Sequence, residues 1–263
     1  MPLAFAGVLF VLGVGGAFVS GLVGVGGAIV MIPFLLYGPP LLGVGALDIK
    51  TVAAITMVQV FVASVSGMIA HGRHRAVNRR LATVGGAAMA AGSLAGAVGS
   101  KYVPERWLLV VFATMVTVAF ALMLLPEPPP DVAQPAEVKE YSAPLTALTT
   151  GVVGVAAGLV GAGGAFLLVP LLLVVVGVPI RVTIGSSLAI TAVAATAGVL
   201  GKAVTGQIPV GPALVVAAGA LPGAQLGAIA SRRLSGVALK RTLLVVIVAT
   251  GVKVWWDVLS GWQ

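Results

Sequence analysis

The chain of 263 residues is 59% hydrophobic and only 8% charged, which excludes a soluble globular protein and predicts a helical protein that spans a membrane several times. It contains no cysteine, so disulfides, thiolate metal sites and cysteine catalysis are excluded. The net charge of +8 arises from basic residues in short loops, a pattern that sets orientation in a membrane and does not indicate nucleic acid as a partner.

The first half of the chain predicts four long apolar helices and one short one. The short one makes only about 15 Å of helix, half of a hydrocarbon core, and is stopped by Gly38, Pro39 and Pro40. The first two helices therefore predict a broken hairpin that dips into the bilayer, although residues 41–47 could extend it to a full crossing. The expected helices are residues 3–23, 28–37, 48–70, 81–100 and 107–125.

A hydrophilic stretch at residues 126–144 separates this half from a second one. Its run of three prolines and its four acidic residues cannot bury a core, so we expect an extended or disordered linker. The second half repeats the order of the first, with a short piece stopped by Gly177 and Pro179. We therefore expect two transmembrane repeats, residues 1–125 and 145–263, and eight to ten membrane segments. The helices of the second repeat are residues 145–160, 165–176, 181–200, 210–230 and 237–256.

Both repeats contain the same glycine-rich motif. It reads GLVGVGGAIVMIP over residues 21–33 and GLVGAGGAFLLVP over residues 158–170. Because every backbone N–H and C=O in hydrocarbon must be satisfied internally, such a break is tolerated only where it faces protein or a wet cavity. Breaks at corresponding places in two halves are typical of a transporter's binding site. Close helix packing through small residues is the alternative, but three glycines in four residues favour a site.

The basic loops indicate that the two repeats are inverted. In the first repeat the basic loop, residues 73–80, follows the second long helix. In the second repeat it carries Arg232, Arg233, Lys240 and Arg241 and follows the third. Placing both loops in the cytoplasm makes the halves run in opposite senses, with the linker cytoplasmic and both chain ends outside. We expect a multi-pass protein of the cytoplasmic membrane of a prokaryote, and the sequence leaves a homodimer open.

The paired motifs, the short helix after each, and the later helix with a Gly-x-x-x-Gly spacing resemble the TauE/SafE family of membrane permeases. The resemblance covers nearly the whole chain except the linker. It implies a secondary transporter that exports sulfite or a small organosulfonate. Where members often have an Ala-Thr-Ser run, this chain has Ala53-Ala54-Ile55-Thr56, so hydroxyl ligation carries over at Thr56.

A sulfite or sulfonate group needs several N–H and O–H donors and positive potential. A glycine break offers free N–H groups where the next helix begins, and the helix dipole adds about half a positive charge. The expected backbone donors are Gly26, Gly27 and Ala28 with Gly163, Gly164 and Ala165. The expected side-chain donors on the neighbouring helices are Thr56, Gln59, Ser186, Ser187 and Thr191. For each Ser and Thr the alternative is a hydrogen bond to the backbone of its own helix.

Other polar residues and other functions are weighed against this interpretation. Lys50 and Arg181 begin equivalent helices, where they either line vestibules that attract anions or extend to the interface. No Asp, Glu or Lys is expected midway along a span, which disfavours an ATP motor, a metal-ion path and a carboxylate proton relay. We expect no enzyme, no metal and no cofactor. The alternatives are a small-anion channel, an intramembrane enzyme and a purely structural membrane protein; the partners expected are a small anion and lipid.

Overall fold

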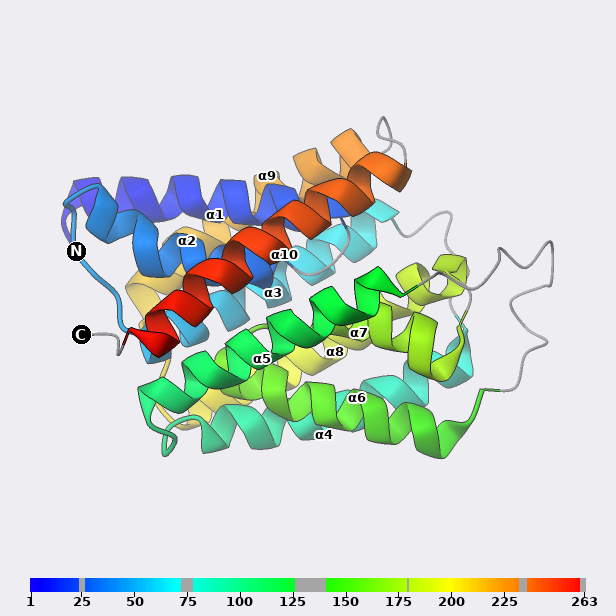
Figure 1. The fold of residues 1–263 in the computed structure, drawn as a ribbon. Coiled ribbons are helices and arrows are strands. Elements are labelled where there is room, and N and C mark those ends of the chain that lie inside the picture. Colours follow the sequence, from blue (N-terminus) through cyan, green and yellow to red (C-terminus); the bar gives the residue numbers. More distant parts are fainter. Residues whose placement is uncertain (24–26, 72–77, 126–140, 179, 232–235, 261–263) are drawn as a thin grey trace.

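The computed structural model describes residues 1–23, 27–71, 78–125, 141–178, 180–231 and 236–260, and the elements within these ranges are helices (Figure 1). The first half contains α1 (Leu3–Val23), α2 (Ala28–Leu41), α3 (Ile49–His71), α4 (Arg79–Gly99) and α5 (Glu105–Leu124). The second contains α6 (Ala143–Val160), α7 (Ala165–Leu171), the π-helical turn η1 (Leu172–Val176), α8 (Ile180–Val204), α9 (Val210–Ser231) and α10 (Gly236–Leu259).

Seven of the described helices are long and apolar enough to cross a bilayer by length and composition. They lie in α1, α3, α4, α5, α6, α8 and α9. Two shorter apolar helices, Ala28–Leu41 and Ala165–Val176, follow the two glycine motifs, as the sequence predicts. The prediction of an all-helical protein with several membrane segments is confirmed.

The end of α2 differs from the sequence prediction. The helix does not stop before Gly38 but continues through Pro39 and Pro40 to Leu41. A proline fixes φ near the helical value, so Pro39 and Pro40 can continue the helix, although each lacks the N–H that would donate to the carbonyl four residues earlier. The carbonyl oxygens of that turn are then satisfied from beyond the helix, because the N–H of Leu42 donates to Gly38 at 3.2 Å and the N–H of Val44 to Pro39 at 3.2 Å. At about 21 Å, the helix is still shorter than a hydrocarbon core.

Two close helix crossings join the halves. Helix α1 packs on α9 and α4 packs on α6, at opposite edges of the bundle in Figure 1. A Cβ added at Gly96 of α4 would overlap the Val155 carbonyl of α6, and one added at Gly227 of α9 would overlap the Phe18 carbonyl of α1. The Gly-x-x-x-Gly spacing thus brings backbone onto backbone in both crossings. The two crossings use corresponding residues of the repeats.

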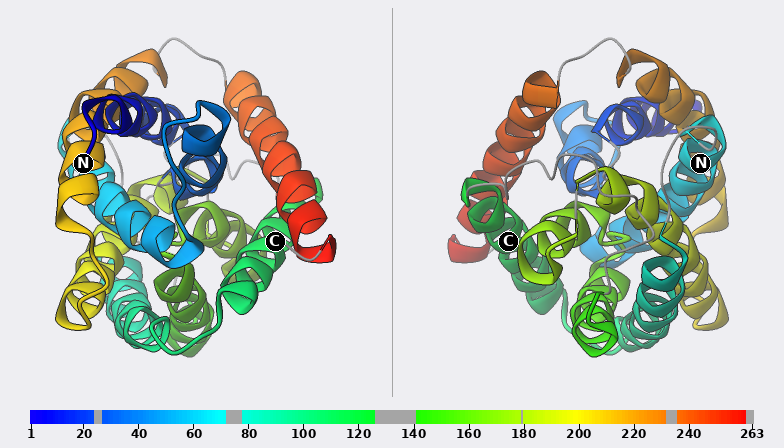
Figure 2. Two further views of the ribbon diagram at one scale, coloured as in Figure 1. Left: turned by 90° about the vertical axis from the view of Figure 1, so that its left-hand side faces the viewer. Right: turned by 90° about the vertical axis from the view of Figure 1, so that its right-hand side faces the viewer.

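Helix α10 holds α2 at both of its ends. Near the start of α2, the Thr250 hydroxyl donates to the Ile29 carbonyl at 3.2 Å. Near its end, the Tyr37 hydroxyl donates to the Asp257 carboxylate, which also pairs with Lys253 at 2.6 Å. The outer side of α10 meets α5, with which it lies on one side of the bundle in the end views of Figure 2.

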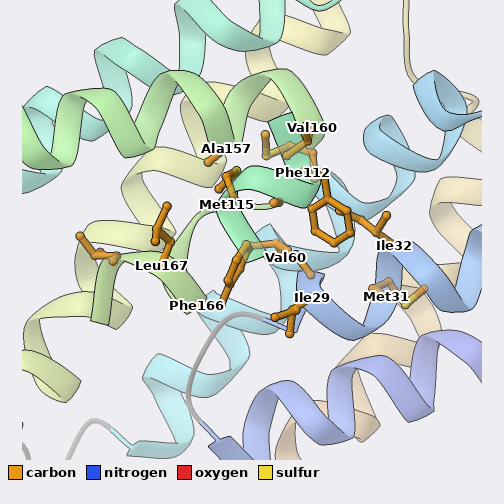
Figure 3. Close-up of a cluster of buried hydrophobic side chains, with 14 of the residues drawn as sticks. Ile29, Met31, Ile32, Val60, Phe112, Met115, Ala157, Val160, Phe166 and Leu167 are labelled. Atoms are coloured by element: carbon orange, nitrogen blue, oxygen red, sulfur yellow. The ribbon is translucent and has the colours of Figure 1, made fainter. Parts of the chain in front are cut away.

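The middle of the bundle is filled by an apolar cluster to which both short helices contribute. Figure 3 shows Ile29 of α2 and Phe166 of α7 in this cluster together with Val60 of α3 and Phe112 of α5. The rings of Phe112 and Phe166 meet edge to face with centroids 6.4 Å apart. The cluster places the first turns of both short helices in the interior, beside α3 and α5.

Candidate functional site

The second glycine break is built from glycines that hold backbone conformations other residues avoid. Gly161 closes α6 with φ of 71°, Gly163 follows with φ of 60°, and Gly164 opens α7 with φ of 69°. An L-residue in this left-handed region suffers a clash of its Cβ with the following carbonyl, which costs about 1–2 kcal/mol, whereas glycine does not. The chain can therefore stop one helix and start the next within four residues.

This break packs against α3 of the other half. A Cβ at Gly161 would overlap the carbonyl of Ala53, and one at Gly163 would overlap the Val60 side chain. Ala53, Thr56 and Val60 are spaced three and four residues apart, so they lie on one face of α3. Thr56 thus sits on the face of α3 that the second break covers, between the two points of contact.

The first break is described from Gly27 onward, and Gly26 lies outside the described residues. Gly27 opens α2 with φ of 68°, matching Gly164 in the other half. A Cβ at Gly27 would lie 2.5 Å from the Cβ of Ser20, so packing and backbone conformation both demand glycine there. Ala28 and Ala165, the first residues of α2 and α7, are fully buried. As in any helix, the first N–H groups of these two have no acceptor within their own helix.

Three of the predicted side chains are buried and have no hydrogen-bond partner. The Thr56 hydroxyl, both polar atoms of Gln59 and the Thr191 hydroxyl are all enclosed and unpaired, and all three residues are fully buried. Other threonines of this chain satisfy themselves locally: Thr117 donates to Ala113 at 2.9 Å and Thr150 to Thr146 at 2.8 Å. The usual local hydrogen bond of a helical threonine is therefore absent at Thr56 and Thr191, where α3 and α8 pass through the interior.

Comparison with known proteins now bears on this site. A family model described as "Sulfite exporter TauE/SafE" matches residues 9–254. The chain belongs to the TauE/SafE family. It is 25% identical over 261 residues to the "Probable membrane transporter protein YunE" of Bacillus subtilis (strain 168), an alignment that covers 93% of this chain and 95% of that protein. No solved structure matches the chain. The family and the relative's name identify a membrane transporter, not an enzyme.

Two other predicted residues of this TauE/SafE protein do not join the unpaired set. Ser186 is fully buried, but its hydroxyl accepts a hydrogen bond from the backbone N–H of Asn78 at 3.2 Å, at the start of α4. Ser187 is also fully buried and has an interaction partner. Of the predicted side chains, those without a hydrogen-bond partner are therefore Thr56, Gln59 and Thr191.

The structure adds three serines that the sequence prediction missed. The hydroxyls of Ser64 and Ser66 on α3 and of Ser93 on α4 are buried and unpaired. A Cβ at Gly198 of α8 would lie 2.7 Å from the Ser93 oxygen, so this hydroxyl faces the contact between α4 and α8. For Ser93 the sequence contains one signal: this serine follows the first glycine of a Gly-x-x-x-Gly pair, a spacing typical of a close contact between two helices.

A lysine lies where the sequence analysis placed a loop. The sequence predicts a helix over residues 181–200 and leaves Lys202 in the loop that follows, whereas Lys202 belongs to the last turn of α8 and is fully buried. Its ammonium donates to the Ser100 hydroxyl at 2.8 Å. Lysine near the end of an apolar run normally extends to the interface, which is why the sequence pattern alone points outward.

The chemistry available to the site is that of hydrogen-bond donors without metal ligands. Among the described residues, no group of three or more His, Asp and Glu side chains could hold a metal ion. The unpaired hydroxyls and the Gln59 amide can donate, and the starts of two helices contribute partial positive charge. Such an arrangement can bind an anion, and its side-chain atoms are enclosed in this structure.

Proposed function

We propose that this TauE/SafE transporter is a secondary transporter that exports a small oxyanion of the sulfite or organosulfonate class, bound near the membrane midplane at the two glycine breaks. The observation that carries the proposal is the set of buried, unpaired atoms on Thr56, Gln59 and Thr191. An unsatisfied buried polar group costs about 1–3 kcal/mol, and hydrogen bonds from a bound ligand would remove that cost.

The ligand class follows from which partners are missing. Backbone N–H groups, hydroxyls and a primary amide suit an oxygen-rich anion that accepts several hydrogen bonds. The starts of α2 and α7 favour negative charge, and the family name points to the same class. In this interpretation the first residues after each break, Gly27 with Ala28 and Gly163 with Gly164 and Ala165, present N–H groups to the anion.

We further propose that the two halves are inverted repeats, with the linker cytoplasmic and both chain ends outside. The matching contacts of α1 with α9 and of α4 with α6 support this arrangement. In transporters built from inverted repeats, the central site is exposed alternately to the two sides of the membrane, and we expect the same here.

Labelling of single cysteines tests the orientation. Because the chain has no native cysteine, Asn78→Cys and Ser260→Cys can each be probed with an impermeant maleimide on intact cells. We expect Ser260→Cys to react and Asn78→Cys to be protected until the membrane is permeabilised. Reaction of both from the same side would contradict the inverted arrangement.

Substitution of the unpaired side chains tests the site. Loss of one hydrogen bond to a charged ligand costs roughly 1.5–3 kcal/mol, so Gln59→Leu and Thr191→Val should each weaken sulfite binding about 10- to 150-fold. Neither should lower the melting temperature of the empty protein, because each removes a polar group that has no partner. Binding and transport would be measured with radiolabelled sulfite on purified protein and in proteoliposomes.

Thr150→Val is the matched control. This threonine is equally buried, but its hydroxyl already donates to the Thr146 carbonyl. Sulfite binding should be unchanged in the control. Equal effects in Thr150→Val and Thr191→Val, or no sulfite binding by the unaltered protein, would refute the proposed site. Unitary currents in place of saturable exchange would make the protein a channel.

A further inference from the structure

The ammonium of Lys202 is a buried charge without a counter-ion in the described part of the chain. The residue is fully buried in the last turn of α8, and its ammonium forms no ion pair with a described carboxylate. An uncompensated charge of this kind is among the most unfavourable groups a protein can bury. A role that needs the charge is therefore expected of Lys202.

The hydrogen bonds around Lys202 leave most of its donors free. Its Nζ donates to the Ser100 hydroxyl at 2.8 Å, and Ser100 in turn lies 2.7 Å from the Ala97 carbonyl and 2.9 Å from Gln207 Oε1. Gln207 donates to the Ala97 carbonyl at 2.9 Å and to the Thr205 hydroxyl at 2.6 Å. The residues around the ammonium are thus linked to one another by hydrogen bonds. An ammonium has three donors, and only Ser100 accepts from it among the described residues.

At the same end of the bundle, Lys50 and Lys101 form hydrogen bonds that stabilise the fold. Lys50 donates to the carbonyl of Lys101 at 3.1 Å, and Lys101 donates to the carbonyl of Thr205 at 3.3 Å. Both therefore satisfy carbonyls beyond a helix end, the usual place for a lysine. Lys202 donates to a hydroxyl instead and is the fully buried one of the three.

Two unpaired hydroxyls lie between this end of the bundle and the central site or within that site, those of Ser93 and Thr191. Ser93 lies on α4 seven residues before Ser100, the residue that caps this helix, which is about 10 Å along the helix axis. The Ser93 hydroxyl is unpaired and faces Gly198, one turn before Lys202 on α8. Thr191 lies about 16 Å from Lys202 along the same helix. The Ser93 hydroxyl thus meets α8 between Lys202 and Thr191, a residue of the proposed central site.

We propose that Lys202, with Ser100 beside it, forms a second anion-binding site, at which the transported oxyanion enters or leaves the protein. The inference rests on the proposed function and adds a site to it. A sulfite or sulfonate oxygen would supply the missing counter-charge and accept from the free N–H groups of the ammonium. Because the side chain is enclosed, this end of the bundle must open before the anion reaches it.

The test compares Lys202→Gln with two variants. Lys202→Arg keeps the charge, and Lys101→Gln removes a charge from the same end of the bundle at an exposed residue. In proteoliposomes with radiolabelled sulfite, Lys202→Gln should raise KM for sulfite at least about 10-fold and flatten its dependence on ionic strength. Lys202→Arg should stay within about threefold of the unaltered protein, and Lys101→Gln should not change KM.

The outcomes separate this inference from the proposed function. If the unaltered protein neither binds nor transports sulfite, the proposed function fails. If it does both and Lys202→Gln keeps the same KM, the central site stands and the second site is refuted. If Lys202→Gln does not fold, the KM of Ser100→Ala for sulfite decides, because this variant leaves the central site intact. A raised KM for sulfite in Ser100→Ala supports the second site, and an unchanged KM overturns it.

Discussion

Glycine serves two purposes in this transporter, and the breaks and the crossings show the difference. In the crossings, Gly96 and Gly227 have ordinary helical backbones and are needed because another backbone lies against them. In the breaks, Gly161 and Gly164 take positive φ values and are also tightly packed. In a crossing, glycine is needed because a Cβ would not fit. In a break, it is needed for that reason and also because the backbone has a positive φ. The second combination marks where a helix is interrupted in the interior.

The largest loss of stability is expected from a substitution of Gly161, which has both a positive φ and a very close backbone contact. Gly161→Ala places a Cβ into the Ala53 carbonyl and forces an L-residue into the left-handed region. The strain alone costs about 1–2 kcal/mol, and the backbone overlap requires α3 or the break to move. We expect little folded protein, measured as the monodisperse fraction in size-exclusion chromatography of detergent extracts.

Gly177→Ala is the control for that prediction. Gly177 has a φ of 73° but no atom lies within 4 Å of an added Cβ, so only the conformational strain remains. The protein should fold with a stability loss of about 1–2 kcal/mol. If Gly161→Ala and Gly177→Ala were equally mild, the contact between the second break and α3 would be wrong.

A smaller effect is expected in the crossings. Gly96→Ala adds a Cβ against the Val155 carbonyl, which should cost about 1–3 kcal/mol by overpacking, measured by thermal melting in detergent. Gly86→Ala on the same helix meets no atom within 4 Å, and alanine should instead stabilise that helix by about 0.5–1 kcal/mol. If close approach of the helices explains the crossing glycines, the melting temperature should fall in Gly96→Ala and rise in Gly86→Ala. A change of the same sign in both variants would contradict this explanation.

The sequence predicted the helices well because their signal is local. Apolar runs of bilayer length and the glycine motif mark α1 to α10 to within a few residues, apart from the end of α2, where Pro39 and Pro40 continue the helix. The buried, unpaired side chains of the candidate site could be singled out for the same reason, because Thr56, Gln59 and Thr191 are polar residues in apolar helices. Whether a hydroxyl has a partner depends on the neighbouring helix, however, so the engagement of Ser186 with Asn78 could not be foreseen.

Lys202 was missed on physical grounds of the same kind. A lysine at the end of an apolar run can lie in water or inside the bundle, and the difference depends on what surrounds it in three dimensions. Ser100 is about a hundred residues away in the chain, and Gln207 approaches only because the turn after α8 brings it back. The spacing of Lys202, Ser100 and Gln207 in the sequence therefore does not predict that they come into contact.

The attachment of α2 to α10 has a mechanical consequence. Because Thr250 bonds to Ile29 and Asp257 to Tyr37, α10 is fixed to the short helix at two points more than a turn apart. Two separated attachments prevent rotation as well as sliding, so the pair moves as one rigid body for as long as both bonds persist. Any displacement of the first break that carries α2 must then carry α10 with it. Helix α10 also packs on α5, where Trp255 donates to Thr117 at 2.9 Å, so a displacement of α10 must either break that contact or carry α5 as well.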